Sequence, residues 1–324
     1  MIKVGIVGYG NLGKGACLAL EKSIDMECVG IFTRREPKSI TPIINVPVYH
    51  VDELDNFANE IDVLLLCGGS ATDLPQTTAK LLEKFNTVDS FDTHANVPAY
   101  FDSLEKVAKQ NGTLAGISIG WDPGVFSIAR MLFGAVLPDG NDYTFWGKGV
   151  SQGHSDAIRR IKGVVNAIQY TIPNKDAIDK VRKGLNPQFT AREKHFRECF
   201  VAVSDDADKG EIERAIKEMP NYFADYDTIV NFVSEQEVLD KQKNLSHGGF
   251  VFRSGKTSQE NSQLLELSLK LDSNPEFTGS VLTAYARAVA RLNKEGKSGV
   301  VTVFDVPLKY LSPMSEEDLR AKLL

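Results

Sequence analysis

The chain has 324 residues, of which 42% are hydrophobic and 25% charged, which is typical of a soluble protein long enough for two domains. Its formal net charge of −6 argues against nucleic acid as the main partner, because binding to a phosphate backbone depends on an excess of Lys and Arg. No apolar run approaches the length that spans a bilayer, and the N-terminus leads directly into an apolar strand, so we expect neither a membrane segment nor a secretory signal.

The beginning of the chain predicts a nucleotide-binding turn. Residues 2–7 are a short, β-branched apolar run, typical of a buried strand. The pattern G-x-G-x-x-G follows at once, where glycines permit a tight turn and let a pyrophosphate approach the N-terminus of the next helix. Such a pattern alone is weak, but its place between a strand and a helix strengthens it. We therefore expect the cofactor to contact Gly8, Tyr9, Gly10, Asn11, Leu12 and Gly13.

The end of the second predicted strand, residues 27–32, indicates which dinucleotide binds. An NAD-binding chain carries Asp or Glu at this point, to accept a hydrogen bond from the ribose 2′-hydroxyl. Thr33, Arg34 and Arg35 stand there instead. Each charge-assisted bond from arginine to a phosphate is worth about 1.5–3 kcal/mol, so this triplet predicts NADP rather than NAD.

Strand-like and helix-like segments alternate through the rest of the first third of the chain. Buried parallel strands are expected at 61–67, 86–91 and 113–119. Helices are expected at 98–111 and at 72–84, the latter with Thr72 or Asp73 as its N-cap. This order predicts the α/β fold class, with a Rossmann-type doubly wound domain.

In such a sheet ligands bind beyond the carboxyl ends of the strands, so the residues after each strand are candidates for cofactor contact. A single Asp there is as often a helix cap as a functional group. Asp92 and Asp122, however, follow neighbouring strands, and a pair is harder to dismiss. The other candidates are Cys67, Gly68, Gly69, Ser70 and Thr72, then Ser90 and Phe91, then Ile119, Gly120, Trp121 and Pro123.

The pattern changes after about residue 125, where strands and helices no longer alternate strictly. Strand-like runs lie at 164–172, 198–204, 227–233 and 249–254, and helices are expected at 175–183, 208–218, 258–270 and 278–294. This mixture predicts an α+β domain for substrate and subunit contacts. We expect a nucleotide-binding domain at 1–123 and a second domain at 124–299, with the segment from about 300 to 324, strand-like over 299–306, packing back on the first.

Polar residues of the second part indicate what the substrate carries. Arg197, Thr171 and His247 are residue types that hold a carboxylate, whereas Asp and backbone carbonyls hold an ammonium group. Each has an ordinary alternative: Arg197 as a surface ion pair, His247 as a turn residue and Asn274 as a turn former before proline. The residues alone leave these alternatives open.

The cysteines predict a reducing compartment. Cys17, Cys28, Cys67 and Cys199 are isolated in apolar contexts, with no C-x-x-C pair and no Cys and His at metal-binding spacing. We therefore expect reduced thiols in a cytoplasmic protein, and no metal site.

Strings of residues in both parts of the chain resemble the diaminopimelate dehydrogenase family. In the first part they are Gly8–Gly13, Phe32–Arg35, Cys67–Asp73 and Gly120–Gly124. In the second part they are Thr144–Gly147, Ser151–Asp156, Met219–Phe223, His247–Gly249 and Leu271–Thr278. The similarity runs nearly end to end, and the strings of the second part are unusual, so the resemblance is specific.

The resemblance implies a reversible, NADP-dependent oxidative deamination of the D-centre of meso-2,6-diaminopimelate. Hydride would pass to the nicotinamide, and the imine would be hydrolysed to L-2-amino-6-oxopimelate and ammonia. The family also implies a homodimer and a place in the synthesis of lysine and cell-wall precursors. A substrate with ammonium and carboxylate groups at both ends fits a site that mixes Asp with Arg, Thr and His.

The resemblance also implies which residues meet the reacting centre. Asp92 and Asp122 would hold its ammonium group, and one of them or a water would accept the proton as the imine forms. Trp146 would wall the pocket and exclude water, and the same pocket would be lined by Trp121, Gln152 and Gly153.

The distal L-centre has its own set of implied contacts. Thr171, Arg197 and His247 would hold its carboxylate, and Asn274 its amino group or a carboxylate oxygen. Because unpartnered buried polar groups are costly, the LL- and DD-isomers would be poor substrates of such a site.

Two other interpretations stay open. One is another NADP-dependent amino-acid dehydrogenase or reductase of the same two-domain build, such as a homoserine or saccharopine-type enzyme, against which the strings at 121–124 and 152–156 count. The other is a non-catalytic NADP-binding protein, which would be free to lose Asp92 and Asp122.

Overall fold

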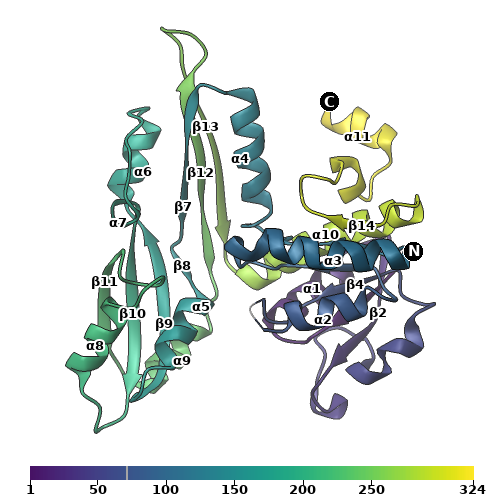
Figure 1. The fold of residues 1–324 in the computed structure, drawn as a ribbon, viewed down its shortest axis with the longest axis horizontal. Helices are drawn as coiled ribbons and strands as arrows, with labels where there is room; N and C mark the ends of the chain where they lie inside the picture. The colour runs from purple at the N-terminus through teal and green to yellow at the C-terminus, as the bar shows by residue number, and fades with distance from the viewer. Residues whose placement is uncertain (71) are drawn as a thin grey trace. The chain divides into compact units, whose positions relative to one another are not determined.

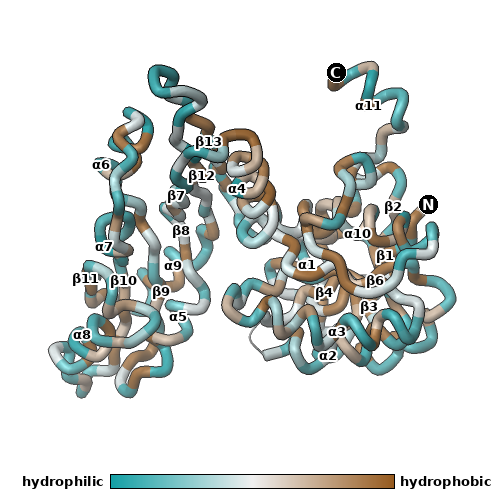
Figure 2. The backbone as a smooth tube through the Cα atoms, turned by 45° about the horizontal axis from the view of Figure 1, so that its top comes forward, coloured by the Kyte–Doolittle hydropathy of each residue, from teal (hydrophilic) through white to brown (hydrophobic). Residues whose placement is uncertain are grey.

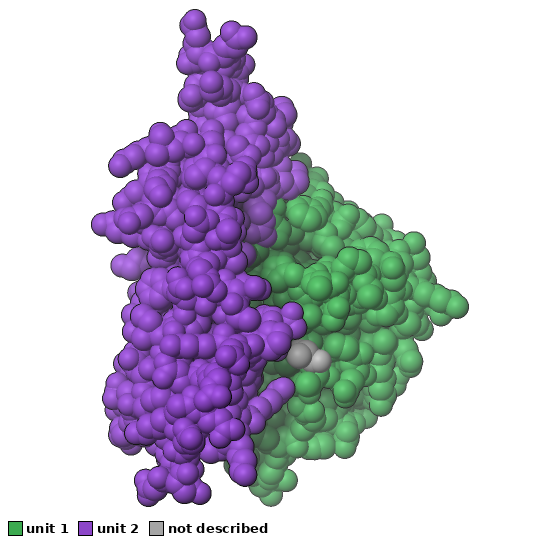
Figure 3. Space-filling view, turned by 60° about the vertical axis from the view of Figure 1, so that its left-hand side comes forward, with its two compact units in different colours: residues 1–128, 275–324 green, residues 129–274 purple. Residues whose placement is uncertain are grey.

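The structure is a computed structural model that describes residues 1–70 and 72–324. It divides into two compact units, coloured separately in Figure 3. Unit 1 consists of Met1–Ile128 and Pro275–Leu324, and unit 2 of Ala129–Asn274. Within the described residues, no helix combines the length and the apolar character that crossing a membrane requires.

Unit 1 is built on a parallel sheet of seven strands in the order β14-β6-β5-β4-β1-β2-β3. Figure 1 labels β2, β4 and β14 of this sheet. The strands are β1 (Ile2–Val7), β2 (Met26–Thr33), β3 (Val48–His50), β4 (Val63–Leu66), β5 (Thr87–Asp89), β6 (Leu114–Gly116) and β14 (Gly299–Val301). The chain runs outward from β1 to β3 and then returns to β4 on the other side of β1. This reversal creates the crevice in which such sheets bind nucleotides.

Apolar helices cover both faces of this sheet, which confirms the predicted fold class. Ile6 and Leu65 face a core shared with α1 (Asn11–Glu21) and α10 (Asn274–Lys294). Leu64 and Leu66 face the opposite core, which is shared with the 3-10 helix η2 (Val51–Phe57), α2 (Leu74–Leu81) and α3 (Val97–Asn111). Burial on both sides explains why the strands are almost continuously hydrophobic.

Helix α10 belongs to unit 1, although we expected residues 124–299 to form the second domain. Its side chains Leu282, Tyr285 and Val289 are buried in the core that includes α1. A Cβ on Gly15 of α1 would lie 2.5 Å from the Pro275 carbonyl oxygen, so the two helices cross with no room for a side chain. Because α1 and α10 are more than 250 residues apart in sequence, their contact could not be predicted from a local sequence pattern.

The C-terminal segment also lies in unit 1, where Arg287 and Arg291 of α10 hold it. The Arg287 guanidinium donates to the Leu311 carbonyl at 2.9 Å, and that of Arg291 to the Ser312 carbonyl at 2.7 Å. Strand β14 ends at Val301, so the strand-like run expected to reach 306 is shorter than predicted. A 3-10 helix, η4 (Leu308–Leu311), and α11 (Glu316–Leu323) complete the segment.

Unit 2 contains two sheets. The first has the order β11-β10-β9-β8 and the second β13-β12-β7. The strands are β7 (Gly140–Trp146), β8 (Gly149–Val150), β9 (Val164–Pro173), β10 (His195–Val203), β11 (Asp227–Phe232), β12 (His247–Lys256) and β13 (Ser262–Leu271). The helices are α5 (Gln152–Arg159), α6 (Lys175–Arg182), α7 (Ala191–Lys194), α8 (Lys209–Lys217) and α9 (Glu235–Gln242), and α4 (Val125–Val136) begins in unit 1.

The helix expected at 258–270 is wrong, because this segment forms β13, antiparallel to β12. Leu265, Leu267, Leu269 and Leu271 are more buried than the polar residues between them. That alternation has the period of a strand, and pairing with β12 outweighs the helix propensity of leucine and glutamate.

Candidate active site

The glycine-rich turn of unit 1 has the geometry that a bound pyrophosphate requires. Gly8 has φ +95°, and a Cβ on Gly13 would lie 2.2 Å from the Gly8 carbonyl oxygen, so neither position accommodates a side chain. Around Gly10, by contrast, a Cβ would meet nothing within 4 Å. Gly10 is the N-cap of α1, and no side chain caps its N–H groups. The helix N-terminus is therefore open to an anion.

A pocket of about 630 Å³ joins this turn to two neighbouring strand ends of unit 1. It brings together nine of the residues predicted to contact the cofactor. They are Gly8, Tyr9 and Gly10 after β1, Thr33, Arg34 and Arg35 after β2, and Cys67, Gly68 and Gly69 after β4. Asn11, Leu12 and Gly13 lie in the first turn of α1 and do not line the pocket. Ser70 and Thr72, which come before α2, do not line it either.

Arg34 and Arg35 both line this pocket, but their side chains have different partners. The Arg35 guanidinium donates to the Tyr9 carbonyl at 2.5 Å, and its backbone N–H donates to the Thr33 hydroxyl at 3.2 Å. The Arg34 side chain is 75% exposed and pairs with Asp73 at 3.1 Å. Surface pairs of this kind are worth at most about 1 kcal/mol, so a phosphate can replace Asp73 as the partner of Arg34.

Sequence reasoning missed the part of this pocket that α2 supplies. Asp73 stands at the N-cap position, but its side chain does not cap the helix; it accepts from the Gly69 N–H at 2.9 Å. The expected N-cap interaction is therefore wrong, and the helix is shorter than the predicted 72–84. The spacing of one helical face could have indicated the further lining residues Asp73, Gln76, Thr77 and Lys80.

The two candidate acids follow adjacent strands of the sheet. Asp92 comes after β5, is exposed, and its backbone N–H donates to the Ser70 hydroxyl at 2.9 Å. Asp122 comes after β6 and is half-buried. Since β5 and β6 pair in parallel, the two segments leave the sheet at the same edge.

The remaining predicted cofactor contacts lie in these same two segments. Phe91 is buried and stacks on Tyr100, with ring centroids 4.2 Å apart. Trp121 is also buried and packs edge-on against Phe126 at 5.2 Å. Ser90, Ile119, Gly120 and Pro123 accompany them in the two segments.

In unit 2, the strand register places four residues in one row across the first sheet. Gly149 of β8 is opposite Thr171 of β9, which is opposite Arg197 of β10, which is opposite Thr228 of β11. Residues in register on neighbouring strands project from the same face. The row therefore brings two of the predicted substrate residues together from distant parts of the chain.

The Arg197 guanidinium is buried without a negative partner. Its side chain hydrogen-bonds the Thr171 hydroxyl and covers the Tyr226 ring, with the guanidinium carbon 3.9 Å from the ring centroid. The residue is 7% exposed, and among the described residues no carboxylate lies within ion-pair distance of it. The Nε of Arg197 and the hydroxyl of Thr228 are both buried, and neither has a hydrogen-bond partner among the described residues. A cation held in this way calls for an anionic ligand.

His247 and Trp146 lie beside this row and contact its elements. A Cβ on Gly149 would lie 2.2 Å from the His247 ring, so the imidazole rests directly on that glycine. The Trp146 backbone N–H donates to Nε2 of His195 at 2.8 Å, and the two rings stack. Burial lowers the pKa of His195 to about 3, which keeps Nε2 free to accept this bond.

The last predicted substrate residues occupy helix starts. Gln152 and Gly153 are exposed in the first turn of α5, where Ser151 contacts Nδ1 of His154 at 2.7 Å. Burial and the nearby Arg197 lower the pKa of His154 to about 4. Asn274 begins α10, and its backbone N–H donates to the Leu245 carbonyl at 2.9 Å.

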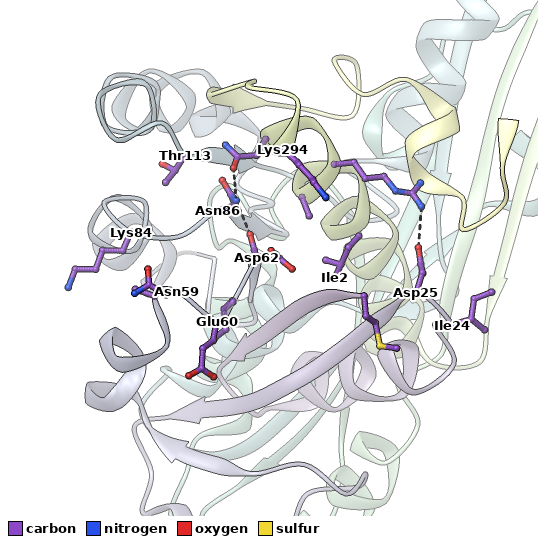
Figure 4. Close-up of a pocket in the computed structure, with 16 residues that line it drawn as sticks. Ile2, Ile24, Asp25, Asn59, Glu60, Asp62, Lys84, Asn86, Thr113 and Lys294 are labelled. Carbon is purple, nitrogen blue, oxygen red and sulfur yellow. Dashed lines mark hydrogen bonds and ion pairs between the residues drawn. The ribbon is translucent and has the colours of Figure 1, made fainter.

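A larger pocket of about 900 Å³ lies at the opposite, amino-terminal edge of the parallel sheet (Figure 4). Several of its polar groups bond to one another. Asp25 accepts from Arg291 at 3.2 Å, and the Asn86 amide donates to the Asp62 carbonyl at 2.8 Å. We therefore assign no ligand to it. In the described part of the chain no cluster of His, Cys, Asp and Glu could hold a metal ion, and the four cysteines are free thiols.

Comparison with known proteins identifies the family. A family model described as the diaminopimelic acid dehydrogenase C-terminal domain matches residues 120–273. The chain is 58% identical over its full length to a meso-diaminopimelate D-dehydrogenase of Acetivibrio thermocellus, of which the match covers 98%.

Solved structures agree with this comparison. A variant of the Clostridium tetani enzyme with DAP has a TM-score of 0.96 and 50% identity over all of both chains. An engineered D-amino acid dehydrogenase bound to NADP+ has a TM-score of 0.89 and 41% identity over 100% of this chain and 99% of its own. This chain therefore belongs to the meso-diaminopimelate D-dehydrogenase family.

Proposed function

We propose that the protein catalyses the reversible, NADP-dependent oxidative deamination of the D-centre of meso-2,6-diaminopimelate, giving L-2-amino-6-oxopimelate and ammonia. The observation that carries the proposal is Arg197, a buried guanidinium without a carboxylate partner among the described residues. An amino acid with a second carboxylate far from its reacting centre supplies that partner. The relative that carries DAP in its solved structure supports this choice of substrate.

The residues of unit 1 fit the cofactor. The open N-terminus of α1 at Gly10 would hold the pyrophosphate, and Thr33, Arg34 and Arg35 would hold the 2′-phosphate. When bound, NADP supplies a hydride acceptor. Asp89, Asp92 and Asp122 are the acids at the ends of the neighbouring strands, so they would lie toward the nicotinamide half.

Asp92 and Asp122 would act on the reacting centre. Both are ionisable groups accessible to a ligand, since one is exposed and the other half-buried. Their carboxylates would hold the substrate ammonium group, and one of them or a water would take its proton as the hydride leaves. Water then adds to the iminium carbon, and ammonia departs to give the ketone.

Residues of unit 2 would recognise the distal end. Thr171, Arg197 and His247 would bind the distal carboxylate, and Asn274 the distal amino group or a carboxylate oxygen. Trp146 of unit 2 would wall the substrate, together with Gln152 and Gly153, and Trp121 is the further substrate contact that we propose for unit 1. An isomer that leaves these buried groups without partners would bind poorly, which would make the site selective for the meso form.

We further propose that the protein is a homodimer in the cytoplasm. Met131, Leu132 and Val136 of α4 are 48–57% exposed, and Figure 2 shows this helix as hydrophobic over much of its length. Such a patch supports association with a second copy. The free thiols support a reducing compartment. Light scattering tests the dimer, which requires twice the chain mass of 35.6 kDa.

The reaction is tested by following the absorbance of reduced nicotinamide with NADP+ and meso-diaminopimelate. LL-diaminopimelate and NAD+ serve as controls. We expect a rise only with the meso isomer and NADP+. A rise with an unrelated D-amino acid alone would indicate a different dehydrogenase, and NADP+ binding without any reduction would indicate a non-catalytic binding protein.

A further inference from the structure

Asp89 is a fully buried carboxylate at the end of β5, close in sequence to the candidate acid Asp92. It is the last residue of β5, three positions before Asp92, and its exposed fraction is 0%. Burying an ionised carboxylate is costly unless hydrogen bonds compensate. Burial raises the pKa of Asp89 to about 6, so the carboxylate form is still available at neutral pH.

The Asp89 side chain bonds to both segments that carry the candidate acids. Its Oδ1 accepts from the Phe91 N–H at 2.9 Å and from the Ser118 N–H at 3.2 Å. Its backbone carbonyl accepts from the Ile119 N–H at 2.9 Å. One residue thus links the segment that leads to Asp92 with the segment that leads to Asp122.

A tyrosine fixes the other carboxylate oxygen. The buried Tyr100 hydroxyl donates to Oδ2 at 2.8 Å and lies 2.7 Å from the Thr78 hydroxyl, which donates to the Leu74 carbonyl at 2.9 Å. This chain of bonds anchors Asp89 to α2 and α3. Both of its oxygens are therefore held, and the carboxylate cannot rotate without losing a bond.

The backbone conformation of Ser118 explains why the segment that leads to Asp122 needs the hydrogen bond to Asp89. The φ of Ser118, +57°, is in the left-handed region, which a residue with a Cβ adopts at a cost. The bond from its N–H to Asp89 holds it there. Without that bond the segment would relax toward an ordinary backbone conformation, and Asp122, four residues later, would move with it.

We propose that Asp89 is a positioning residue for the dehydrogenase reaction, whose carboxylate fixes the segments bearing Asp92 and Asp122 relative to each other through the N–H groups of Phe91 and Ser118. The proposal rests on the proposed function. Asp89 need not touch the substrate; it sets where the two acids stand. A displacement of about 1 Å at a reacting centre can cost about 100-fold in rate, so a small relaxation here is sufficient.

The test compares Asp89→Ala with Asp89→Asn. The alanine variant loses every side-chain bond, and we expect kcat for meso-diaminopimelate to fall about 10- to 100-fold. KM for meso-diaminopimelate should stay within about threefold, because the distal carboxylate is held in unit 2. The asparagine variant keeps an oxygen for both N–H groups, and its amide can donate to Tyr100. It should therefore recover most of the lost kcat.

The matched control is Asp62→Ala, which removes another carboxylate that accepts from a backbone N–H, that of Lys3 at 2.7 Å, at the opposite edge of the sheet. It should leave kcat unchanged. An Asp89→Ala variant with the kcat of the wild type would overturn the proposal. If that variant does not fold, Asp89→Asn decides, since a loss of kcat above about tenfold would show that charge rather than placement matters.

Hydrogen exchange separates this proposal from the proposed function. The Phe91 and Ser118 amides should be protected in the wild type and in Asp89→Asn, whether or not the protein oxidises diaminopimelate. Fast exchange of both amides in the wild type would contradict the positioning role. An inactive wild type with protected amides would contradict only the reaction.

Discussion

Arg34 and Arg35 would both bind the 2′-phosphate of NADP, Arg34 from an exposed side chain and Arg35 from one that is hydrogen-bonded to the backbone. The Arg35 guanidinium donates to the Tyr9 carbonyl, whereas Arg34 is exposed and pairs with Asp73. Replacing both by serine should therefore erode the preference for NADP+ over NAD+ by about 100-fold or more, as the loss of two charge-assisted bonds implies.

The measurement is the ratio of kcat/KM for the two cofactors. Arg320→Ser is the control, because it removes an exposed arginine of α11 that pairs with Glu316 of its own helix. An unchanged ratio in the double variant would show that the 2′-phosphate does not bind at these arginines.

Sequence alone can identify residues whose chemical type and position within a motif carry the meaning. Arg34, Arg35 and the glycines before them are of this kind. Asp73 and Asp89 are not, because an isolated Asp has the same appearance as a helix cap or a surface charge. Their roles come from partners that are distant in sequence, such as Arg34 and Ser118, and only folding brings these together.

At the scale of elements, β8 and β12 are coupled through Gly149 and His247. A Cβ at Gly149 would overlap the imidazole, so Gly149→Ala must displace His247. We expect KM for meso-diaminopimelate to rise about tenfold, since a bond to the distal carboxylate is weakened. Gly134→Ala in α4 is the control, because a Cβ there meets nothing within 4 Å.

A double-mutant cycle checks this cause. In a His247→Ala background, Gly149→Ala should add almost nothing, because the ring that it displaces is already gone. Additive effects on KM would show that the glycine acts on something other than His247.

The elements themselves were predictable where periodicity and position agree. Strands β1, β2, β4, β5 and β6 and helices α3, α6 and α8 follow directly from apolar runs and helical spacing, whereas the three-residue strand β3 does not. Segment 258–270 combines Leu and Glu, which favour helices, with an alternation that favours a strand, and the strand forms. The place of α10 in unit 1 depends on the close crossing at Gly15, which no local pattern encodes.

At the scale of the whole molecule, buried histidines predict how stability responds to acid. The pKa of His195 is about 3 and that of His154 about 4, and burial also lowers that of His247. An unfolded histidine has a pKa of about 6.5. At a pH between the native and the unfolded pKa of such a histidine, the unfolded chain binds a proton that the native protein does not. The free energy of unfolding therefore falls as the pH falls below about 6.5.

The raised native pKa of Asp89 has the opposite effect, because protonation of this carboxyl below about pH 6 favours the native protein. This single group is outweighed by the three histidines. For His195 alone the loss between pH 6.5 and 5 is about 2 kcal/mol. Urea unfolding at pH 8 and pH 5 measures it. The variant His195→Gln, which cannot take a proton, should lose less stability on acidification than the wild type. His94→Gln, at an exposed position, should behave as the wild type does, and equal losses in all three proteins would contradict this account.

The central claim is that a D-amino acid is oxidised while Arg197 holds a carboxylate at its far end. The most direct measurement compares kcat/KM of the wild type and Arg197→Met for meso-diaminopimelate and for D-lysine, which lacks the distal carboxylate. Arg192→Met, at an exposed arginine of unit 2 that pairs with Asp227, is the control.

We predict that Arg197→Met lowers kcat/KM for meso-diaminopimelate about 10- to 100-fold, mainly through KM. The kcat/KM for D-lysine, which we expect to be low in the wild type, should stay unchanged. KM for NADP+ should not change. An equal loss for both substrates, or no loss for either, would contradict the claim that Arg197 recognises the distal carboxylate.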